Sequence, residues 1–141
     1  MSYTFTVPFD PAKPDLTADH DTQNEIFLQV FNTGDGALFD SLYLEDSISN
    51  FSGAPLTGEA RLAFFKEFLA TKPDLKATLT HAYVAGDVAL IGVEYAIDTV
   101  GPDGKPLHLA GVCTDVLRLQ EDGRWLMSID RPVAANGLVA E

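Results

Sequence analysis

Residues 113–130 read CTDVLRLQEDGRWLMSID, and the fold prediction starts from their pattern. Apolar and polar side chains alternate on both sides of Asp122-Gly123, a dipeptide that favours a tight turn between two antiparallel strands. The alternation continues back to Leu75, with further turn signals at Gly86-Asp87 and at GPDG, residues 101–104. The pattern predicts an antiparallel meander of strands near residues 75–85, 88–100, 105–120 and 125–132.

Before Leu75 the apolar residues recur with the spacing of helices. Thr22-Gln23-Asn24-Glu25 fits a capping box, and the helix that it begins is predicted to stop at Gly34. Asp35 can cap a short second helix. A third helix is predicted over residues 58–71, because Pro73 prevents its continuation. Helices followed by a meander predict an α+β fold, with three N-terminal helices packed on a curved, mainly antiparallel sheet.

The chain length of 141 residues predicts a single folded domain. Three prolines among acidic residues predict an extended arm over residues 1–21 rather than a packed element. The α+β domain is expected over residues 22–132, and residues 133–141 are expected to form a C-terminal tail.

Composition excludes several classes of function. A net charge of −12 disfavours nucleic acid and anionic membranes as partners, because both are negatively charged. The lone Cys113 excludes an intrachain disulfide, and the three histidines lack the spacing of metal ligands. We expect no metal and no cofactor, since no glycine-rich loop suggests a nucleotide. Without a signal peptide or an 18-residue apolar run, the chain is expected to be cytoplasmic.

The turns give a map of the sheet. With two-residue turns at Gly86-Asp87 and Asp122-Gly123 and a four-residue loop at 101–104, counting outward places Leu90 beside Asp115 and Asp115 beside Asp130. We expect the helices to cover this face and enclose a pocket for a small molecule. The face is predicted to carry Leu79, His81, Tyr83, Leu90, Gly92, Glu94, Cys113, Asp115, Leu117, Ser128 and Asp130.

The other face of the predicted sheet is more apolar. Its predicted residues are Ile91, Val93, Tyr95, Val112, Val116, Trp125, Met127 and Ile129. The chain has only enough helix to cover one face of the sheet. We therefore expect a homodimer that packs sheet against sheet through Tyr95, Val112, Trp125 and Met127.

Three stretches together resemble the SnoaL-like branch of the nuclear-transport-factor-2-like (NTF2-like) superfamily. They are FNTGDGALFDSLYLEDSISNFSGAPLTGEARLAFFKEF at 31–68, GDVALIGVEY at 86–95 and TDVLRLQEDGRWLMSIDRP at 114–132. The resemblance covers roughly residues 20–132 and implies a cystatin-like α+β cone. Members of this superfamily include isomerases, cyclases, dehydratases, epoxide hydrolases and many non-enzymes, so the resemblance specifies the fold more closely than the activity.

Ketosteroid isomerase is a member whose mechanism is well defined. It uses a carboxylate base, a tyrosine and a protonated aspartic acid. The resemblance places that tyrosine at Phe27, the base at Phe51 and the aspartic acid at Asp115. Phenylalanine neither donates a hydrogen bond nor accepts a proton, so the chain is not a standard ketosteroid isomerase. The superfamily's epoxide hydrolases bridge two aspartates with an arginine, but Arg118 and Arg131 fall on the opposite predicted face.

Asp115 and Asp130 are the main candidates for catalysis. Two carboxylates directly opposite each other repel, so one is protonated or a cation or donor lies between them. Such a pair suits acid–base chemistry, whereas a solvated Asp130 and a locally bonded Asp115 would have only a structural role. His81 beside Glu94 is a further candidate base, against the more common structural role of such a histidine.

Two functions therefore remain open on sequence grounds. One is a cofactor-independent isomerase, cyclase or lyase acting on a small hydrophobic molecule, and the other is a non-catalytic ligand-binding or dimerisation module. Aromatic residues at helical spacing serve either reading, because they also build cores. The expected substrate-binding residues are Phe27, Phe31, Tyr43, Phe51, Phe65, Tyr83, Leu90, Glu94, Cys113, Leu117 and Ser128.

Overall fold

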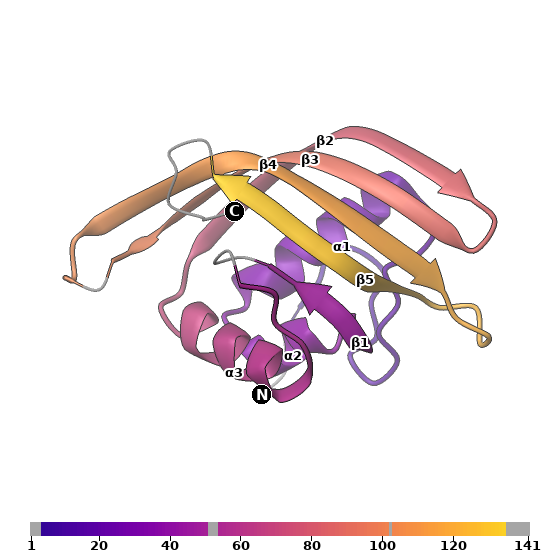
Figure 1. Cartoon of the computed structure of the whole chain (residues 1–141), viewed down its shortest axis with the longest axis horizontal. Coiled ribbons are helices and arrows are strands. Elements are labelled where there is room, and N and C mark those ends of the chain that lie inside the picture. The colour runs from indigo at the N-terminus through magenta and orange to yellow at the C-terminus, as the bar shows by residue number, and fades with distance from the viewer. Residues whose placement is uncertain (1–3, 51–53, 102, 135–141) are drawn as a thin grey trace.

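The computed structural model describes residues 4–50, 54–101 and 103–134, and it has the α+β architecture that the sequence predicts. No helix in these ranges is long and apolar enough to cross a membrane. Figure 1 labels the helices and strands. In chain order they are α1 (His20–Asn32), α2 (Gly36–Asp40), β1 (Tyr43–Ser49), α3 (Gly58–Leu69), β2 (Asp74–Ala85), β3 (Val88–Val100), β4 (Pro106–Leu119) and β5 (Trp125–Ala134).

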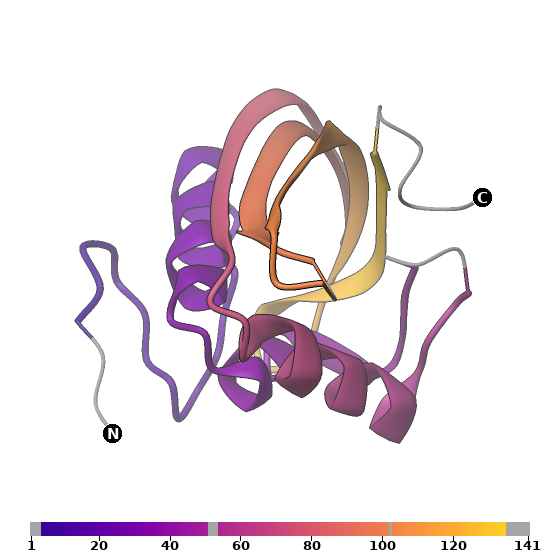
Figure 2. The ribbon, with the colours of Figure 1, turned by 90° about the vertical axis from the view of Figure 1, so that its left-hand side faces the viewer.

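The strands form one sheet in the order β1-β5-β4-β3-β2. Strands β2 to β5 are antiparallel neighbours, which confirms the meander, and β1 adds to the edge parallel to β5. The sheet curls strongly, and the helices lie on its concave side (Figure 2). The convex side has no helix over it in either view.

The helix starts follow capping chemistry. Asp19, not Thr22, caps α1, and its carboxylate accepts hydrogen bonds from the Thr22 amide at 2.9 Å and the Thr22 hydroxyl at 2.7 Å. The predicted capping box at residues 22–25 is therefore wrong by one turn. The predicted cap of α2 is confirmed, since Asp35 accepts from the Leu38 amide at 3.0 Å.

The core lies between the helices and the concave face of the sheet. Phe39 of α2 lies at its centre, with ring centroids 5.2 Å from Phe31 and 4.8 Å from Phe65, both edge to face. The N-terminal arm also contributes, contrary to the expectation from its prolines. Leu16 is fully buried, and its amide donates to the Trp125 carbonyl at 2.8 Å.

The loop between β3 and β4 is one residue longer than the sequence map assumed. Val100 pairs with Pro106, so residues 101–105 form the loop and Ile91, not Leu90, lies opposite Asp115. A shift of one residue turns every side chain of a strand to the other face. Leu90 and Glu94 therefore lie on the convex side and are exposed, whereas Tyr95 lies on the concave side.

Two β-bulges also change the predicted map. Leu117 pairs with Met127 but Val116 pairs with Ile129, so Ser128 is an extra residue in β5. This bulge offsets a longer turn after β4, which is why Asp115 still pairs with Asp130 as predicted. A second bulge follows Leu79 in β2.

The bulge in β5 and the loop between β3 and β4 decide which residues could form a dimer. Trp125 and Met127 lie in the core, 7% and 0% exposed, and Tyr95 is 7% exposed. These three residues cannot form the dimer face that the sequence map assigned to them. Val112, the fourth, is on the convex side and 56% exposed.

Candidate ligand pocket

A cavity of about 220 Å³ lies between the concave face of the sheet and the helices α1 and α3. It is larger than the roughly 150 Å³ cavity that suffices to bind benzene. Its wall is mostly aromatic and aliphatic, and six side chains place polar atoms along it. The lining residues are Gln23, Asn24, Phe27, Phe31, Phe64, Phe68, Leu75, Ala77, Val93, Tyr95, Ile97, Leu109, Cys113, Asp115, Asp130 and Pro132.

Two carboxyl groups lie next to each other in this wall. Asp115 of β4 pairs directly with Asp130 of β5, and the two residues are 3% and 0% exposed. Burial, and then the charge of Asp130 and a hydrogen bond with it, raise the pKa of Asp115 well above its ordinary value. Asp115 is thus a neutral acid over a range of pH in which an exposed aspartate is ionised.

Cys113 lies between the two carboxyl groups. Its sulfur is 3.1 Å from Asp115 Oδ1 and 3.0 Å from Asp130 Oδ1, and its single proton can be donated to either. Burial and the two carboxyl groups raise the pKa of the Cys113 thiol well above its ordinary value. The thiol therefore acts as a hydrogen-bond donor here and not as a nucleophile.

Tyr43 supplies a second donor to Asp130. The Tyr43 hydroxyl, at the start of β1, donates to Asp130 Oδ2. Burial and the neighbouring Asp130 raise the pKa of Tyr43 well above its ordinary value, so the hydroxyl keeps its proton. Asp130 thus accepts from two neutral donors, an environment suited to the ionised carboxylate of the pair.

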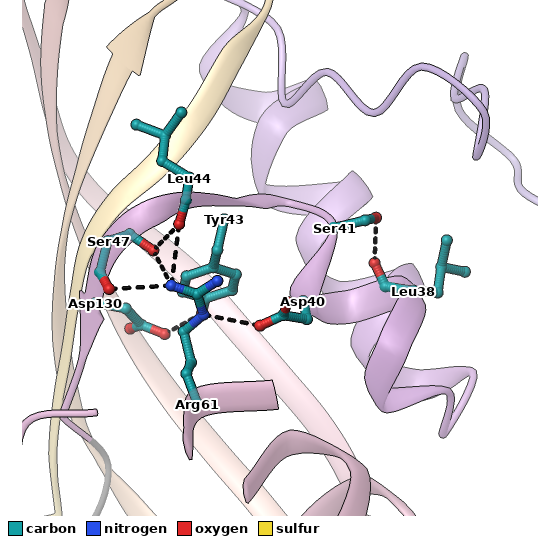
Figure 3. Close-up of polar contacts among 8 residues, drawn as sticks. All are labelled: Leu38, Asp40, Ser41, Tyr43, Leu44, Ser47, Arg61 and Asp130. Carbon is teal, nitrogen blue, oxygen red and sulfur yellow. Dashed lines mark hydrogen bonds and ion pairs between the residues drawn. The ribbon is translucent and has the colours of Figure 1, made fainter. Parts of the chain in front are cut away.

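The guanidinium of a buried arginine lies over the Tyr43 ring (Figure 3). Arg61 of α3 is 3% exposed, and its guanidinium lies 5.4 Å from the centroid of the Tyr43 ring. It donates a hydrogen bond to Asp40 Oδ1 at 2.8 Å. It also donates to two acceptors in β1, the Leu44 carbonyl at 3.0 Å and Ser47 Oγ at 2.7 Å. Arg61 thus fixes β1 and the Tyr43 ring on which Asp130 depends.

The same residues are the candidate metal ligands of the described ranges. Cys113, Asp115 and Asp130 place one ligand atom each within 4.8 Å of the others. A metal ion would require the thiolate and both carboxylates. The raised pKa values of Cys113 and Asp115 mean that a metal ion would have to displace the protons of both groups.

The structure brings five of the predicted site residues into one pocket. Phe27 and Phe31 line it from α1, and Cys113, Asp115 and Asp130 line it from the sheet. Three more lie in the surrounding core without lining the cavity, namely Tyr43, Phe65 and Leu117. Phe51 lies outside the described residues.

The remaining predicted site residues lie away from the pocket. Tyr83 is 65% exposed and Leu90 38% exposed, both on the convex side, where they pair with each other. Glu94 is exposed there as well, and Ser128 occupies the bulge in β5.

His81 is not a base for this pocket. It pairs with Gly92 of β3, and the longer loop between β3 and β4 places both residues on the convex side. A Cβ on Gly92 would lie 2.2 Å from the imidazole, so the ring covers that glycine. The ring centroid is 5.6 Å from that of Tyr83.

Sequence reasoning missed three polar residues of the pocket, Gln23, Asn24 and Tyr95. Tyr95 was assigned to the wrong face by the loop length. Gln23 carried a usable signal, because it occupies the helical stripe of Ile26 and Val30, whose members are all buried. A polar residue in a buried stripe indicates either a polar partner or a ligand.

Comparisons with known proteins agree with this architecture. A family model for the SnoaL-like domain matches residues 25–127. No curated protein sequence matches the chain significantly. The similar solved structures described next are less than 25% identical in sequence to this chain, so their likeness concerns the fold alone.

Two solved structures illustrate the likeness. A candidate calcium/calmodulin-dependent protein kinase II association domain from Xanthomonas campestris has a TM-score of 0.68 at 21% identity, covering 95% of this chain and 96% of that one. A candidate dehydratase of the NTF2-like family from Streptomyces avermitilis has a TM-score of 0.61 at 24% identity, covering 76% and 88%.

Proposed function

The chain belongs to the SnoaL-like domain family, and we propose that its pocket binds a small, mostly apolar molecule and transfers a proton on it. The observation that carries this proposal is the buried pair of Asp115 and Asp130 in the cavity wall. The two carboxyl groups have different surroundings: the pKa of Asp115 is raised, and Asp130 accepts from Tyr43 and Cys113. Neighbouring carboxyl groups with different environments are suited to act as acid and base.

The proposed chemistry needs no cofactor. The Asp130 carboxylate removes a proton from the carbon next to a ligand carbonyl, and the Asp115 carboxyl donates a hydrogen bond to the carbonyl oxygen as it gains charge. The proton then returns to another carbon, which is isomerisation, or a leaving group departs from the neighbouring carbon, which is elimination. Phe27, Phe64 and Phe68 in the wall exclude water from the ligand.

A non-catalytic binding function is the second candidate. It is favoured by Phe27, which lines the pocket and can neither donate nor accept a proton. The candidate dehydratase among the similar structures supports the catalytic proposal instead. The two candidates differ in what they require of Asp130.

Proton exchange on a simple ketone separates the two candidates. We expect the protein in D2O to speed the exchange of the α-protons of 4-phenylbutan-2-one, followed by proton NMR. Asp130→Asn should abolish this exchange and Asp115→Asn should slow it by about 10-fold or more. Asp74→Asn, at an exposed position at the start of β2, is the matched control. Ligand binding without any exchange above background would support the binding-only function.

We also propose that the convex face binds a second copy of the chain. Strand pairing aligns Tyr83, Leu90, Val116 and Ile129 in one row across β2 to β5, and Ile48 of β1 pairs with Ile129. Tyr83 is 65%, Ile129 43%, and Leu90 and Ile48 each 38% exposed. An apolar row of this kind is suited to sheet-on-sheet association. One similar structure is named as an association domain, which agrees with such a role.

A further inference from the structure

We infer that Tyr95 and Gln23 form a second polar subsite in the pocket, which binds an uncharged hydroxyl group of the ligand. The inference rests on the proposed function in one respect, namely that the pocket holds a small molecule. It adds that this molecule is polar at two places, one at the carboxyl pair and one at Tyr95 and Gln23. The subsite does not depend on proton transfer at Asp130.

Tyr95 has a buried hydroxyl that lacks a hydrogen-bond partner among the described residues. The residue is 7% exposed and lines the cavity from β3, opposite Gly111 of β4. In the described part of the chain no group hydrogen-bonds to the hydroxyl. Burial, with smaller contributions from Cys113 and Asp130, raises the pKa of Tyr95 to about 12. At neutral pH the group is therefore an O–H that can both donate and accept.

Gln23 presents a second orphan group from the opposite wall. It is 3% exposed in α1, it lines the same cavity, and its side-chain Oε1 is buried without a partner among the described residues. Its neighbour Asn24 differs, because Asn24 Nδ2 donates to the Ala77 carbonyl at 3.1 Å. Asn24 therefore joins α1 to β2, whereas the Gln23 oxygen has no such structural role.

Two orphan groups in one cavity point to a ligand. Buried side-chain polar atoms nearly always have hydrogen-bond partners, so each exception needs a cause. A ligand hydroxyl satisfies both groups, because it can donate to the Gln23 oxygen and accept from the Tyr95 hydroxyl. A carboxylate or phosphate fits poorly, since the pocket already holds the charge of the carboxyl pair.

The backbone of Tyr95 is offset along the sheet from the carboxyl pair, although its hydroxyl lies close enough for Cys113 and Asp130 to affect its pKa. Val93 pairs with Cys113, and Tyr95 is two residues further along β3, a rise of about 7 Å in a strand. A ligand that contacts both places thus carries its two polar groups at different positions of an apolar body. This arrangement selects against plain hydrocarbons and favours hydroxylated ones.

Matched pairs of small molecules test the subsite. The pairs are 4-phenylbutan-2-one with 4-(4-hydroxyphenyl)butan-2-one, acetophenone with 4-hydroxyacetophenone, and toluene with 4-methylphenol. Dissociation constants from NMR titration should be about 3- to 10-fold lower for the hydroxylated member of at least one pair, the amount expected for a neutral hydrogen bond. Tyr95→Phe and Gln23→Leu should each remove most of this gain and leave the affinity of the other member unchanged.

The unliganded variants give an independent readout. Tyr95→Phe removes a hydroxyl that has no partner, so the melting temperature should stay the same or rise. Tyr43→Phe is the matched control, since it removes a hydroxyl that donates to Asp130, and it should lower the melting temperature. A clear loss of stability in Tyr95→Phe would show that the hydroxyl serves the fold.

The inference is overturned if no pair shows a hydroxyl-dependent gain, or if the gain persists in both variants. It is also overturned if Tyr95→Phe weakens both members of a pair equally. Failure of the proposed catalysis is read separately, because α-proton exchange can be absent while the hydroxyl-dependent gain is present. The reverse result, exchange without the gain, would leave the catalytic proposal and remove the subsite.

Discussion

The Tyr43 hydroxyl at the start of β1 donates a hydrogen bond to Asp130 in β5, across 87 residues of sequence. β1 is one of the two edge strands and pairs only with β5 in the sheet order. The contact therefore ties the acid–base pair to the edge of the sheet. Through the guanidinium that lies over the Tyr43 ring, it also ties the pair to Arg61 of α3.

Tyr43→Phe should lower the free energy of unfolding by about 1–3 kcal/mol, because the buried Asp130 loses a donor and the ring stays in place. Urea unfolding at pH 7 measures this change. Tyr83→Phe is the control, since Tyr83 is 65% exposed and should change stability by less than about 0.5 kcal/mol. Equal effects of the two variants would contradict a structural role for the Tyr43 hydroxyl.

Asp115→Asn should change how stability depends on pH. The pKa of Asp115 is raised in the folded protein, whereas in the unfolded chain it lies near 4. As pH rises above about 4 the unfolded chain releases this proton and the folded protein retains it, so the contribution of Asp115 to stability falls. Each unit by which the pKa is raised corresponds to about 1.4 kcal/mol.

The variant lacks this loss, so its stability relative to the unchanged protein should increase steadily from pH 4 upward. Urea midpoints at pH 4 to 8 measure the difference, with Asp74→Asn as the exposed control. A difference that stays constant over this range would mean that Asp115 titrates as an ordinary aspartate. This result would contradict the proposed acid–base role of Asp115 and Asp130.

The sequence predicts the elements of this fold better than it predicts their faces. Alternation along β2 to β5 is a property of each strand, and the strands were found where the pattern indicated. Their relative faces depend on loop length, however, and Lys105 belongs to the loop rather than to the strand. Because Lys105 was counted as a strand residue, Leu90 was predicted to face the pocket and Tyr95 the opposite side, which is the reverse of the structure.

The pairing of Asp115 with Asp130 was predicted correctly although the turn beside it was not. The turn after β4 is longer than the two residues assumed, and the bulge at Ser128 restores the register. Neither deviation has a sequence signal as strong as Asp122-Gly123. The position of Tyr43 beside Asp130 could not be predicted either. β1 pairs with β5 in parallel and no short turn connects them, so their register cannot be counted from a loop length.

Arg61→Met should be strongly destabilising. Arg61 is 3% exposed, and its removal leaves Asp40 and Ser47 Oγ without their donor, while the Leu44 carbonyl keeps only the hydrogen bond from Ser47 Oγ. Breaking a buried ion pair costs about 3–5 kcal/mol, whereas an exposed pair contributes about 1 kcal/mol or less.

The exposed control is Asp46→Asn, which breaks the ion pair with Arg118 that lies at the surface. Arg61→Lys should recover only part of the loss, because an ammonium group cannot reproduce the planar set of donors. Urea unfolding separates the three variants. A small effect of Arg61→Met would show that α3 is held mainly by its aromatic residues.

Ile129→Glu should convert a dimer into a monomer if the convex face binds a second copy. Ile129 lies in the row with Tyr83, Leu90 and Val116, and a charge there would be buried without a partner in the dimer. Val100→Glu is the matched control, since Val100 is similarly exposed at 47% but lies at the far end of β3, outside the row.

Light scattering on a size-exclusion column gives the mass of each variant. The unchanged protein and Val100→Glu should have twice the 15.2 kDa of the chain and Ile129→Glu that of one chain, whereas a dimer that survives Ile129→Glu would exclude this row as the interface.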